Sequence, residues 1–152
     1  MSVKLIAMGN VLMKDDAIGI EVAKMLEAKL SEKNIEIIYG ETDFQYCLAN
    51  VKETDFIFIL DAVFSGKKPG EVTVITLDNL NYRKKGYTQH TYSFLDLLKL
   101  YFTNMEGIIF AIEAKEVEFS LGLSSVLQEK LKDITNFILN EIEVILMEKV
   151  VK

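Results

Sequence analysis

The sequence contains a few polar residues whose types and positions could support metal chemistry. Asp15 and Asp16 are adjacent and follow an apolar run, while Asp61 ends the most apolar segment of the chain. His90 is the only histidine and lies at the end of a polar stretch. Two carboxylates and one imidazole form a plausible site for a borderline divalent ion such as nickel or zinc. Such a set would leave coordination positions open for water or a substrate.

Each of these residues also has a purely structural explanation. Acids in the first turn of a helix cap free N–H groups and complement the helix dipole, for about 0.5–2 kcal/mol. Capping is the favoured explanation for Asp15, whereas for Asp16 capping and ligand binding are evenly balanced. Asp61 could satisfy a neighbouring turn, but α/β proteins bind ligands where buried strands end, which favours a functional role. His90 could be a solvated loop residue.

The hydrophobic pattern of the first half of the chain predicts the elements that carry these acids. Residues 3–8 form an apolar run typical of a strand, and residues of about 15–31 have the spacing of an amphipathic helix. A second strand is expected at 35–39, followed by a short helix capped by Asp43. Residues 55–61 include a continuous run of large apolar residues, which indicates a strand buried on both faces at the centre of a parallel sheet.

The strands of the second half are expected to differ in direction. Residues 71–77 have the mixed polarity of a strand near an edge of the sheet. The link before them, residues 62–70, is too short for the crossover helix that parallel pairing normally needs. This strand should therefore be antiparallel or displaced. Residues 106–112 resemble another buried strand.

Two helices are expected in the second half. The first follows His90, with Thr91 or Ser93 as its N-cap. The second starts with the capping-box pattern Ser125–Gln128 and runs to about Met147 with a continuous apolar stripe. Because the loops of a parallel sheet can open onto the same edge, His90 and the acids could meet there.

Strands that alternate with helices place the chain in the α/β class. We expect three layers, α/β/α, around a mostly parallel, twisted sheet of about five strands, one of them antiparallel. The length of 152 residues fits a single domain over residues 1–152. Half of the residues are apolar, which is enough for a sizeable core without disulfides.

Composition excludes several classes of function. The 17 basic and 23 acidic residues give a net charge of −6, which argues against general binding of nucleic acid. No apolar run approaches the roughly 18 residues needed to span a bilayer, and the start of the chain shows no secretory signal. A single cysteine, Cys47, fits a reducing compartment. We therefore expect a cytoplasmic protein that binds neither membranes nor nucleic acids.

Two further features have ordinary explanations. Cys47 lies on the apolar stripe of the short helix, without a histidine nearby in the sequence, which indicates an inert core cysteine rather than a nucleophile. The basic run Arg83–Lys85 is typical of solvated surface, although beside His90 it could help dock an acidic partner.

The segment 9–19, with the sequence GNVLMKDDAIG, resembles the N-terminal signature of the nickel–iron hydrogenase maturation endopeptidases. The resemblance extends along nearly the whole chain. Leu60–Ala62 is similar to a strand-end Asp-Ala pair of that family, and His90 falls where the family has a histidine before a helix. Leu121–Ser124 is similar to the loop before the family's last helix.

This resemblance implies an aspartic-type peptidase that removes a C-terminal peptide from a hydrogenase large-subunit precursor after nickel has been inserted. It implies that Asp16, Asp61 and His90 are the catalytic residues and bind nickel, which the precursor carries. The family has no obvious serine or cysteine nucleophile. The partner would be the precursor, and we expect the protein itself to be a monomer.

Two positions depart from the family pattern. Asp16 stands where some members have glutamate, which shortens the reach of the carboxylate by one methylene. Glu41 stands where the family more usually has a second glycine, which puts a charged side chain and less backbone freedom beside the expected cleft. These differences bear on the identity of the substrate more than on the fold.

Two other functions fit part of the pattern. A phospho-receiver domain has an acid pair after its first strand and a phospho-accepting aspartate after its third, which Asp15, Asp16 and Asp61 could imitate. Here, however, residues 9–14 separate the strand from the acid pair, and an antiparallel strand at 71–77 fits a receiver badly. The other alternative is a non-catalytic protein that senses nickel-loaded partners.

Overall fold

The computed structural model describes residues 2–78 and 89–151, and the side chains of residues 89–93, 150 and 151 are outside this description. In chain order its elements are β1 (Val3–Met8), the 3-10 helix η1 (Lys14–Ala17), α1 (Ile18–Glu32), β2 (Glu36–Glu41), α2 (Phe44–Ala49), β3 (Phe56–Val63), β4 (Val72–Thr76), α3 (Gln89–Tyr101), β5 (Glu106–Glu113) and α4 (Ser125–Val151). The alternation of strands and helices confirms the predicted α/β class.

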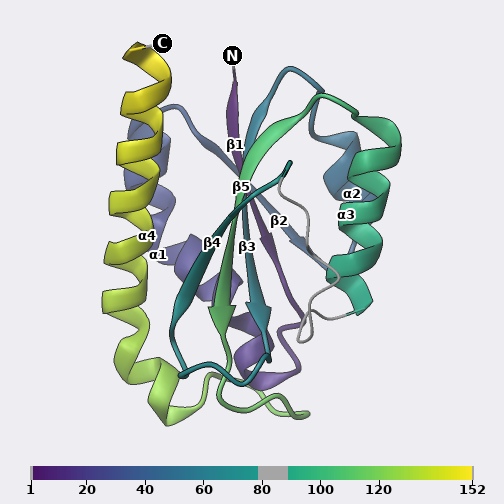
Figure 1. Cartoon of the computed structure of the whole chain (residues 1–152). Helices are drawn as coiled ribbons and strands as arrows, with labels where there is room; N and C mark the ends of the chain where they lie inside the picture. Colours follow the sequence, from purple (N-terminus) through teal and green to yellow (C-terminus); the bar gives the residue numbers. More distant parts are fainter. Residues whose placement is uncertain (1, 79–88, 152) are drawn as a thin grey trace.

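The strands form one five-stranded sheet in the order β2-β1-β3-β5-β4. The pairs β1–β2, β1–β3 and β3–β5 are parallel, and β4 pairs antiparallel with β5 at the edge of the sheet (Figure 1). β3 lies at the centre, and all eight of its residues are buried. The buried central strand and the antiparallel edge strand were both predicted, and both are confirmed.

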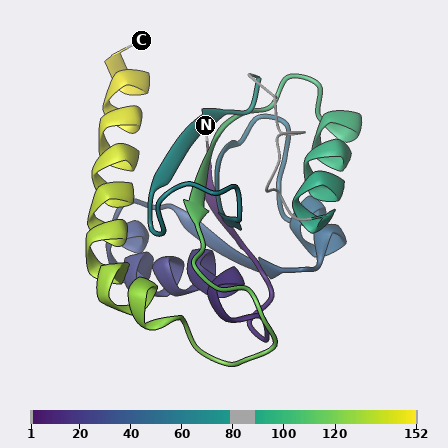
Figure 2. The same cartoon turned by 60° about the horizontal axis from the view of Figure 1, so that its bottom comes forward.

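Helices cover both faces of the sheet and give the predicted three layers. α1 and α4 lie on one face, and α2 and α3 lie on the other (Figures 1 and 2). Because successive side chains of a strand point to opposite faces, the sheet contributes to two cores. Phe58 and Phe110 belong to the core under α1 and α4, whereas Ile59 and Ile109 belong to the core under α2 and α3.

Several predicted helix boundaries were wrong. The segment expected to be helical from residue 15 opens with the 3-10 turn η1 and becomes α-helical only at Ile18. α3 starts before His90, which therefore lies in its first turn, and Thr91 and Ser93 are inside the helix rather than caps. α4 continues past Met147. Local patterns locate helices well but not their ends, because tertiary partners compete for the terminal groups.

α4 is the longest helix, with 27 residues, and packs against α1 and the sheet. Its buried stripe includes Leu127, Ile134, Ile138 and Ile142. None of the helices formed by the described residues, α4 included, is long and apolar enough to cross a membrane.

Candidate active site

Two of the predicted site residues lie at the carboxyl edge of the parallel strands, which is the lower end in Figure 1. Asp16 is in η1, which packs against β3, and Asp61 is the third residue from the end of β3. Both are almost fully buried, with 6% and 2% of their surface exposed. The fold thus brings two acids from distant parts of the sequence to one edge of the sheet.

The turn after β1 holds Asp16. Gly9 has a φ of +137°, and a Cβ at this position would collide with the carbonyl oxygen of Asp16, so both its conformation and its surroundings require glycine. The backbone N–H of Asn10 donates to Asp16 Oδ2 at 2.7 Å. The side chain of Asn10 accepts from the N–H of Leu12 at 2.9 Å, which stabilises the turn. These contacts fix one oxygen of the Asp16 carboxylate.

A second glycine brings the start of α1 close to the sheet. An added Cβ at Gly19 would lie 2.8 Å from the carbonyl oxygen of Leu60 and 3.2 Å from that of Met8. Leu60 directly precedes Asp61, and Met8 ends β1. The helix can approach both strands this closely because the residue has no side chain, and Asp16 in η1 is carried along with it.

Asp61 is part of β3, although the sequence predicted it as the residue that ends the strand. Its Oδ1 accepts a hydrogen bond from the N–H of Ala62 at 2.8 Å, and it pairs in register with Ala111 of β5. Strand alternation puts Asp61 on the same face as Ile57 and Ile59, the face that α2 and α3 cover.

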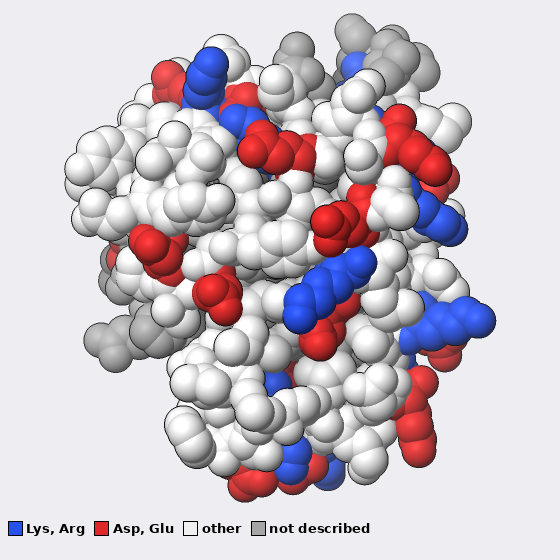
Figure 3. All heavy atoms as spheres, turned by 180° about the vertical axis from the view of Figure 1, so that it is seen from behind, with Lys and Arg blue, Asp and Glu red and all other residues white. Residues whose placement is uncertain are grey.

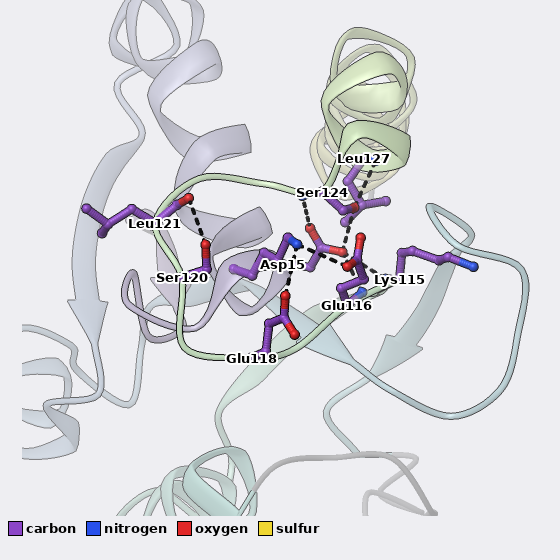
Figure 4. A network of polar contacts seen from close by, with 9 residues as sticks. Asp15, Lys115, Glu116, Glu118, Ser120, Leu121, Ser124 and Leu127 are labelled. Atoms are coloured by element: carbon purple, nitrogen blue, oxygen red, sulfur yellow. Dashed lines mark hydrogen bonds and ion pairs between the residues drawn. The ribbon is translucent and has the colours of Figure 1, made fainter.

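Asp15 does not cap a helix, so that prediction was wrong. Its carboxylate is fully buried, and no side chain caps either η1 or α1. It accepts four hydrogen bonds from the loop between β5 and α4: from the N–H of Lys115 at 3.0 Å, of Glu116 at 2.8 Å and of Ser124 at 2.7 Å, and from Ser124 Oγ at 2.8 Å (Figure 4). Asp15 therefore ties this loop to η1.

Ser124 links the Asp15 cluster to α4. Its hydroxyl donates to Asp15 and accepts from the N–H of Leu127 at 3.3 Å, so it caps α4. The predicted capping box began at Ser125, one residue too late. The serine pair Ser124–Ser125 left the sequence ambiguous, and the position of Asp15 decides which hydroxyl is the cap.

Lys14 adds ion pairs to the same contact. Its Nζ lies 3.0 Å from Glu116 Oε1 and 3.1 Å from Glu118 Oε1. The hydrogen bonds that its amine donates to Glu116 and Glu118 raise the pKa of Lys14 above its usual value, so the amine stays charged throughout the neutral range. The three residues lie at the surface, where such pairs contribute little stability, so their main effect is to orient the loop.

A fourth buried acid at this edge was missed in the sequence. Glu113 ends β5 and is 1% exposed. Its carboxylate accepts from Ser65 Oγ at 2.6 Å, from the N–H of Ser65 at 2.8 Å and from the N–H of Gly66 at 3.2 Å. These bonds account for its burial by holding the β3–β4 loop. An acid at the end of a buried strand, the signal used for Asp61, would also have indicated Glu113.

Glu41 has a backbone conformation that favours glycine. Its φ is +53°, in the left-handed region, and its carbonyl accepts from the N–H of Gly9 at 2.9 Å. The β1–β2 register shifts between Ala7 and Met8, so β2 carries a bulge there. A residue with a side chain costs about 1–2 kcal/mol in this conformation, and such strain is typical of functional edges.

Cys47 is an inert core residue, as predicted. It is fully buried in α2, and an added Cβ on Gly40 would collide with its sulfur. Burial, together with the nearby charge of Asp43, raises the pKa of the Cys47 thiol to about 11. At neutral pH the group is a neutral thiol and a poor nucleophile.

His90 and its basic neighbours are less fully described. The backbone of His90 lies in the first turn of α3, at the end of that helix nearer the carboxyl edge (Figure 1), but its side chain is outside the described residues. Arg83–Lys85 also lies outside them. Among the side chains that are described, no group of three His, Cys, Asp or Glu residues is arranged to hold a metal ion.

Comparison with known proteins assigns the family. The family model described as hydrogenase maturation protease (HycI) matches residues 20–141, most of the chain. The chain belongs to the hydrogenase maturation protease family. The matched range includes Asp61 and His90, and it begins four residues after Asp16. The resemblance of residues 9–19 to the family signature is therefore additional to this match.

Individual relatives of this chain agree with the assignment. A Methanocaldococcus jannaschii protein assigned to the hydrogenase maturation proteases is 27% identical over 146 residues, covering 91% of this chain and 95% of its own length. The structure of the [NiFe] hydrogenase maturation protease HybD from Thermococcus kodakarensis is similar with a TM-score of 0.76 and 26% identity, over 92% of this chain and 98% of that one. The hydrogenase maturating endopeptidase HybD from E. coli has the same fold, with a TM-score of 0.77 and 19% identity over 94% and 93% of the two chains.

Membership of a peptidase family removes the phospho-receiver as an alternative function. The antiparallel β4 at the sheet edge agrees, because it departs from the all-parallel arrangement expected of a receiver. Family membership does not decide the other alternative, a non-catalytic protein that senses nickel-loaded partners, because that alternative concerns activity.

Proposed function

We propose that this protein is the endopeptidase that removes a C-terminal peptide from a hydrogenase large-subunit precursor once nickel has been inserted. The nickel belongs to the substrate. Asp16, Asp61 and His90 complete its coordination, so that only a loaded precursor is bound in a cleavable position. The enzyme acts as an aspartic-type peptidase, and we expect a cytoplasmic monomer.

The observation that carries this proposal is the pair of buried carboxylates at the carboxyl edge. Asp16 and Asp61 come from different segments, and η1 packs directly against β3. Burying carboxylates is costly, so two of them at a ligand-binding edge call for a functional explanation. Asp61 faces the side of the sheet covered by α3, the helix that carries His90 in its first turn. This arrangement supports a shared role for the three residues.

The chemistry of the three side chains suits nickel. Carboxylate oxygen and imidazole nitrogen are good donors for a borderline divalent ion. Holding the precursor's metal centre also aligns the bond to be cut, and such positioning lowers the barrier by several kcal/mol. The metal is then able to polarise the scissile carbonyl or a water molecule. The one cysteine of the chain, Cys47, is buried with a raised pKa, which argues against thiol catalysis.

Co-expression with the hydrogenase precursors of the source organism tests the function. We expect the wild-type protein to convert one precursor to a shorter form, seen by mass spectrometry as the loss of a C-terminal peptide. Asp16→Asn, Asp61→Asn and His90→Ala should each slow this conversion by about a hundredfold or more, because the metal centre is no longer aligned. Glu143→Gln, at an exposed position of α4, is the matched control and should cleave at the wild-type rate.

The need for nickel and the difference between binding and cleavage are tested separately. Purified precursor without nickel should not be cleaved, and adding nickel should restore cleavage. If all three site variants cleaved the precursor at the wild-type rate, these residues would not form the active site. Binding of the loaded precursor without any loss of mass would favour the non-catalytic sensor.

A further inference from the structure

Three large apolar side chains are exposed together on the loops at the carboxyl edge. Leu12, Phe119 and Leu121 are 46%, 80% and 76% exposed, and we call them the apolar ridge. From behind, the lower end of the molecule is largely uncharged, with charged side chains along its margin (Figure 3). Exposed apolar side chains gathered in one place mark interaction sites in soluble proteins.

The two loops that carry the ridge are joined by backbone hydrogen bonds. The N–H of Ser120 donates to the carbonyl of Leu12 at 2.9 Å, and the N–H of Lys14 donates to the carbonyl of Ser120 at 2.9 Å. Met13 and Ser120 form a parallel bridge. Phe119 and Leu121 flank Ser120 in sequence, so all three ridge residues lie around one short piece of sheet.

Side chains behind the ridge hold it in place. The Asp15 carboxylate accepts hydrogen bonds from Lys115 and Glu116 at one end of the loop and from Ser124 at the other. Lys14 forms ion pairs with Glu116 and Glu118 of the same loop. Leu121 points away from this network (Figure 4). A surface that is already ordered loses less conformational entropy when a partner binds. The ridge is therefore a preorganised surface.

Charges around the ridge indicate the kind of partner. Lys14 and the exposed Lys115 balance the charges of Glu116 and Glu118, so the net negative charge of this margin comes from Glu41. Glu41, at the end of the neighbouring strand, is also exposed at the same edge of the sheet. A complementary partner would present an apolar patch bordered by basic residues.

We propose that the apolar ridge docks the folded body of the hydrogenase large-subunit precursor while the precursor's C-terminal segment reaches Asp16 and Asp61. This inference rests on the proposed function. Leu12 lies four residues before Asp16 on the same hydrogen-bonded segment, so a protein bound at the ridge is held in a defined position relative to the carboxylates. The ridge selects the precursor, and the site at the sheet edge tests it for metal.

The double variant Phe119→Ser/Leu121→Ser tests the ridge. We expect both the Kd for the purified, nickel-loaded precursor and the KM for release of its C-terminal peptide to rise about tenfold or more, because central apolar contacts carry most binding energy. The kcat should stay within about twofold of wild type, since the carboxylates are unchanged. The matched control is Leu100→Ser, which removes an equally exposed leucine (74%) near the far end of α3.

The outcomes separate the ridge from the peptidase function. Unchanged Kd and KM in the double variant would overturn the docking role, and so would a wild-type dimer that the double variant converts to a monomer, because the ridge would then hold a second copy. Asp16→Asn keeps the ridge, so it should still bind the loaded precursor, more weakly because one metal ligand is lost, and should cleave it at least about a hundredfold more slowly. If the precursor binds the wild type, loses affinity for the double variant and is never shortened, the docking role stands and the peptidase function fails.

Discussion

Asp15 and Asp16 are adjacent in η1 but have different environments. The Asp15 carboxylate points into the β5–α4 loop and accepts bonds from residues about a hundred positions away in sequence. The Asp16 carboxylate lies toward the Gly9–Asn10 turn, which donates to one of its oxygens. Successive side chains on a 3-10 turn diverge, so the pair divides a structural role from a proposed catalytic one.

Asp15→Ala should lower the free energy of unfolding by about 3 kcal/mol, because it leaves buried N–H groups of the loop without an acceptor. The measurement is urea unfolding followed by circular dichroism. Asp43→Ala is the control: Asp43 also accepts a backbone N–H, from Tyr46 at 3.0 Å, but it is an exposed helix cap and should cost about 1 kcal/mol. Equal losses in the two variants would contradict the importance of the buried cluster.

At the scale of elements, the distance between α1 and the sheet decides where η1 lies. Gly19 sets this distance through its contacts with the carbonyls of Leu60 and Met8. Because η1 and α1 are continuous in sequence, a shift of the helix moves Asp16 away from β3. The geometry of the candidate site is thus a property of helix packing as well as of the turn after β1.

Gly19→Ala should destabilise the protein by about 1–3 kcal/mol, since the new methyl group meets backbone atoms that cannot rotate away. The sign is the opposite of that for an ordinary helical glycine, which alanine stabilises by about 1 kcal/mol. Cleavage of the precursor should slow as well. In the control Gly66→Ala, the added methyl has nothing within 4 Å and meets only an unfavourable φ of +91°, so the rate should be unchanged. A stabilised Gly19→Ala variant would show that α1 is not held this closely.

At the scale of the whole molecule, Cys47 reports on the integrity of the fold. It lies in the core under α2 and α3, where Gly40 of β2 leaves room for its sulfur. Alkylating reagents at about pH 8 should therefore label it only through unfolding, and denaturant should accelerate labelling strongly. Rapid labelling of the native protein would show that α2 opens locally.

The same thiol makes stability depend on pH in the alkaline range. Its pKa rises from 9.0 in the unfolded chain to about 11 in the folded protein. The unfolded state therefore loses its proton first, so stability is constant with respect to this group below pH 9 and falls between pH 9 and about 11. Unfolding curves across this range should show a smaller fall for Cys47→Ala. Identical slopes would mean that Cys47 is not the titrating group.

Much of the fold could be predicted because the necessary information is local. Apolar runs identified the strands, and the short link 62–70 indicated that the strand after it is antiparallel or displaced. The acids after the apolar runs indicated the functional edge, since parallel strands end together there. The sequence alone therefore predicted that Asp16 and Asp61 lie at one edge of the sheet.

The partners of each side chain depended on the tertiary structure. Asp15 was predicted to be a helix cap because the N–H and hydroxyl groups that donate to it could not be known until the β5–α4 loop folded over η1. The contact between this loop and η1 also makes Ser124, not Ser125, the cap of α4. It places Leu12 and Leu121 on one exposed surface. Hydrophobic periodicity is a property of neighbouring residues and can be read along the chain. Hydrogen bonds between residues a hundred positions apart exist only once packing has brought the two loops together.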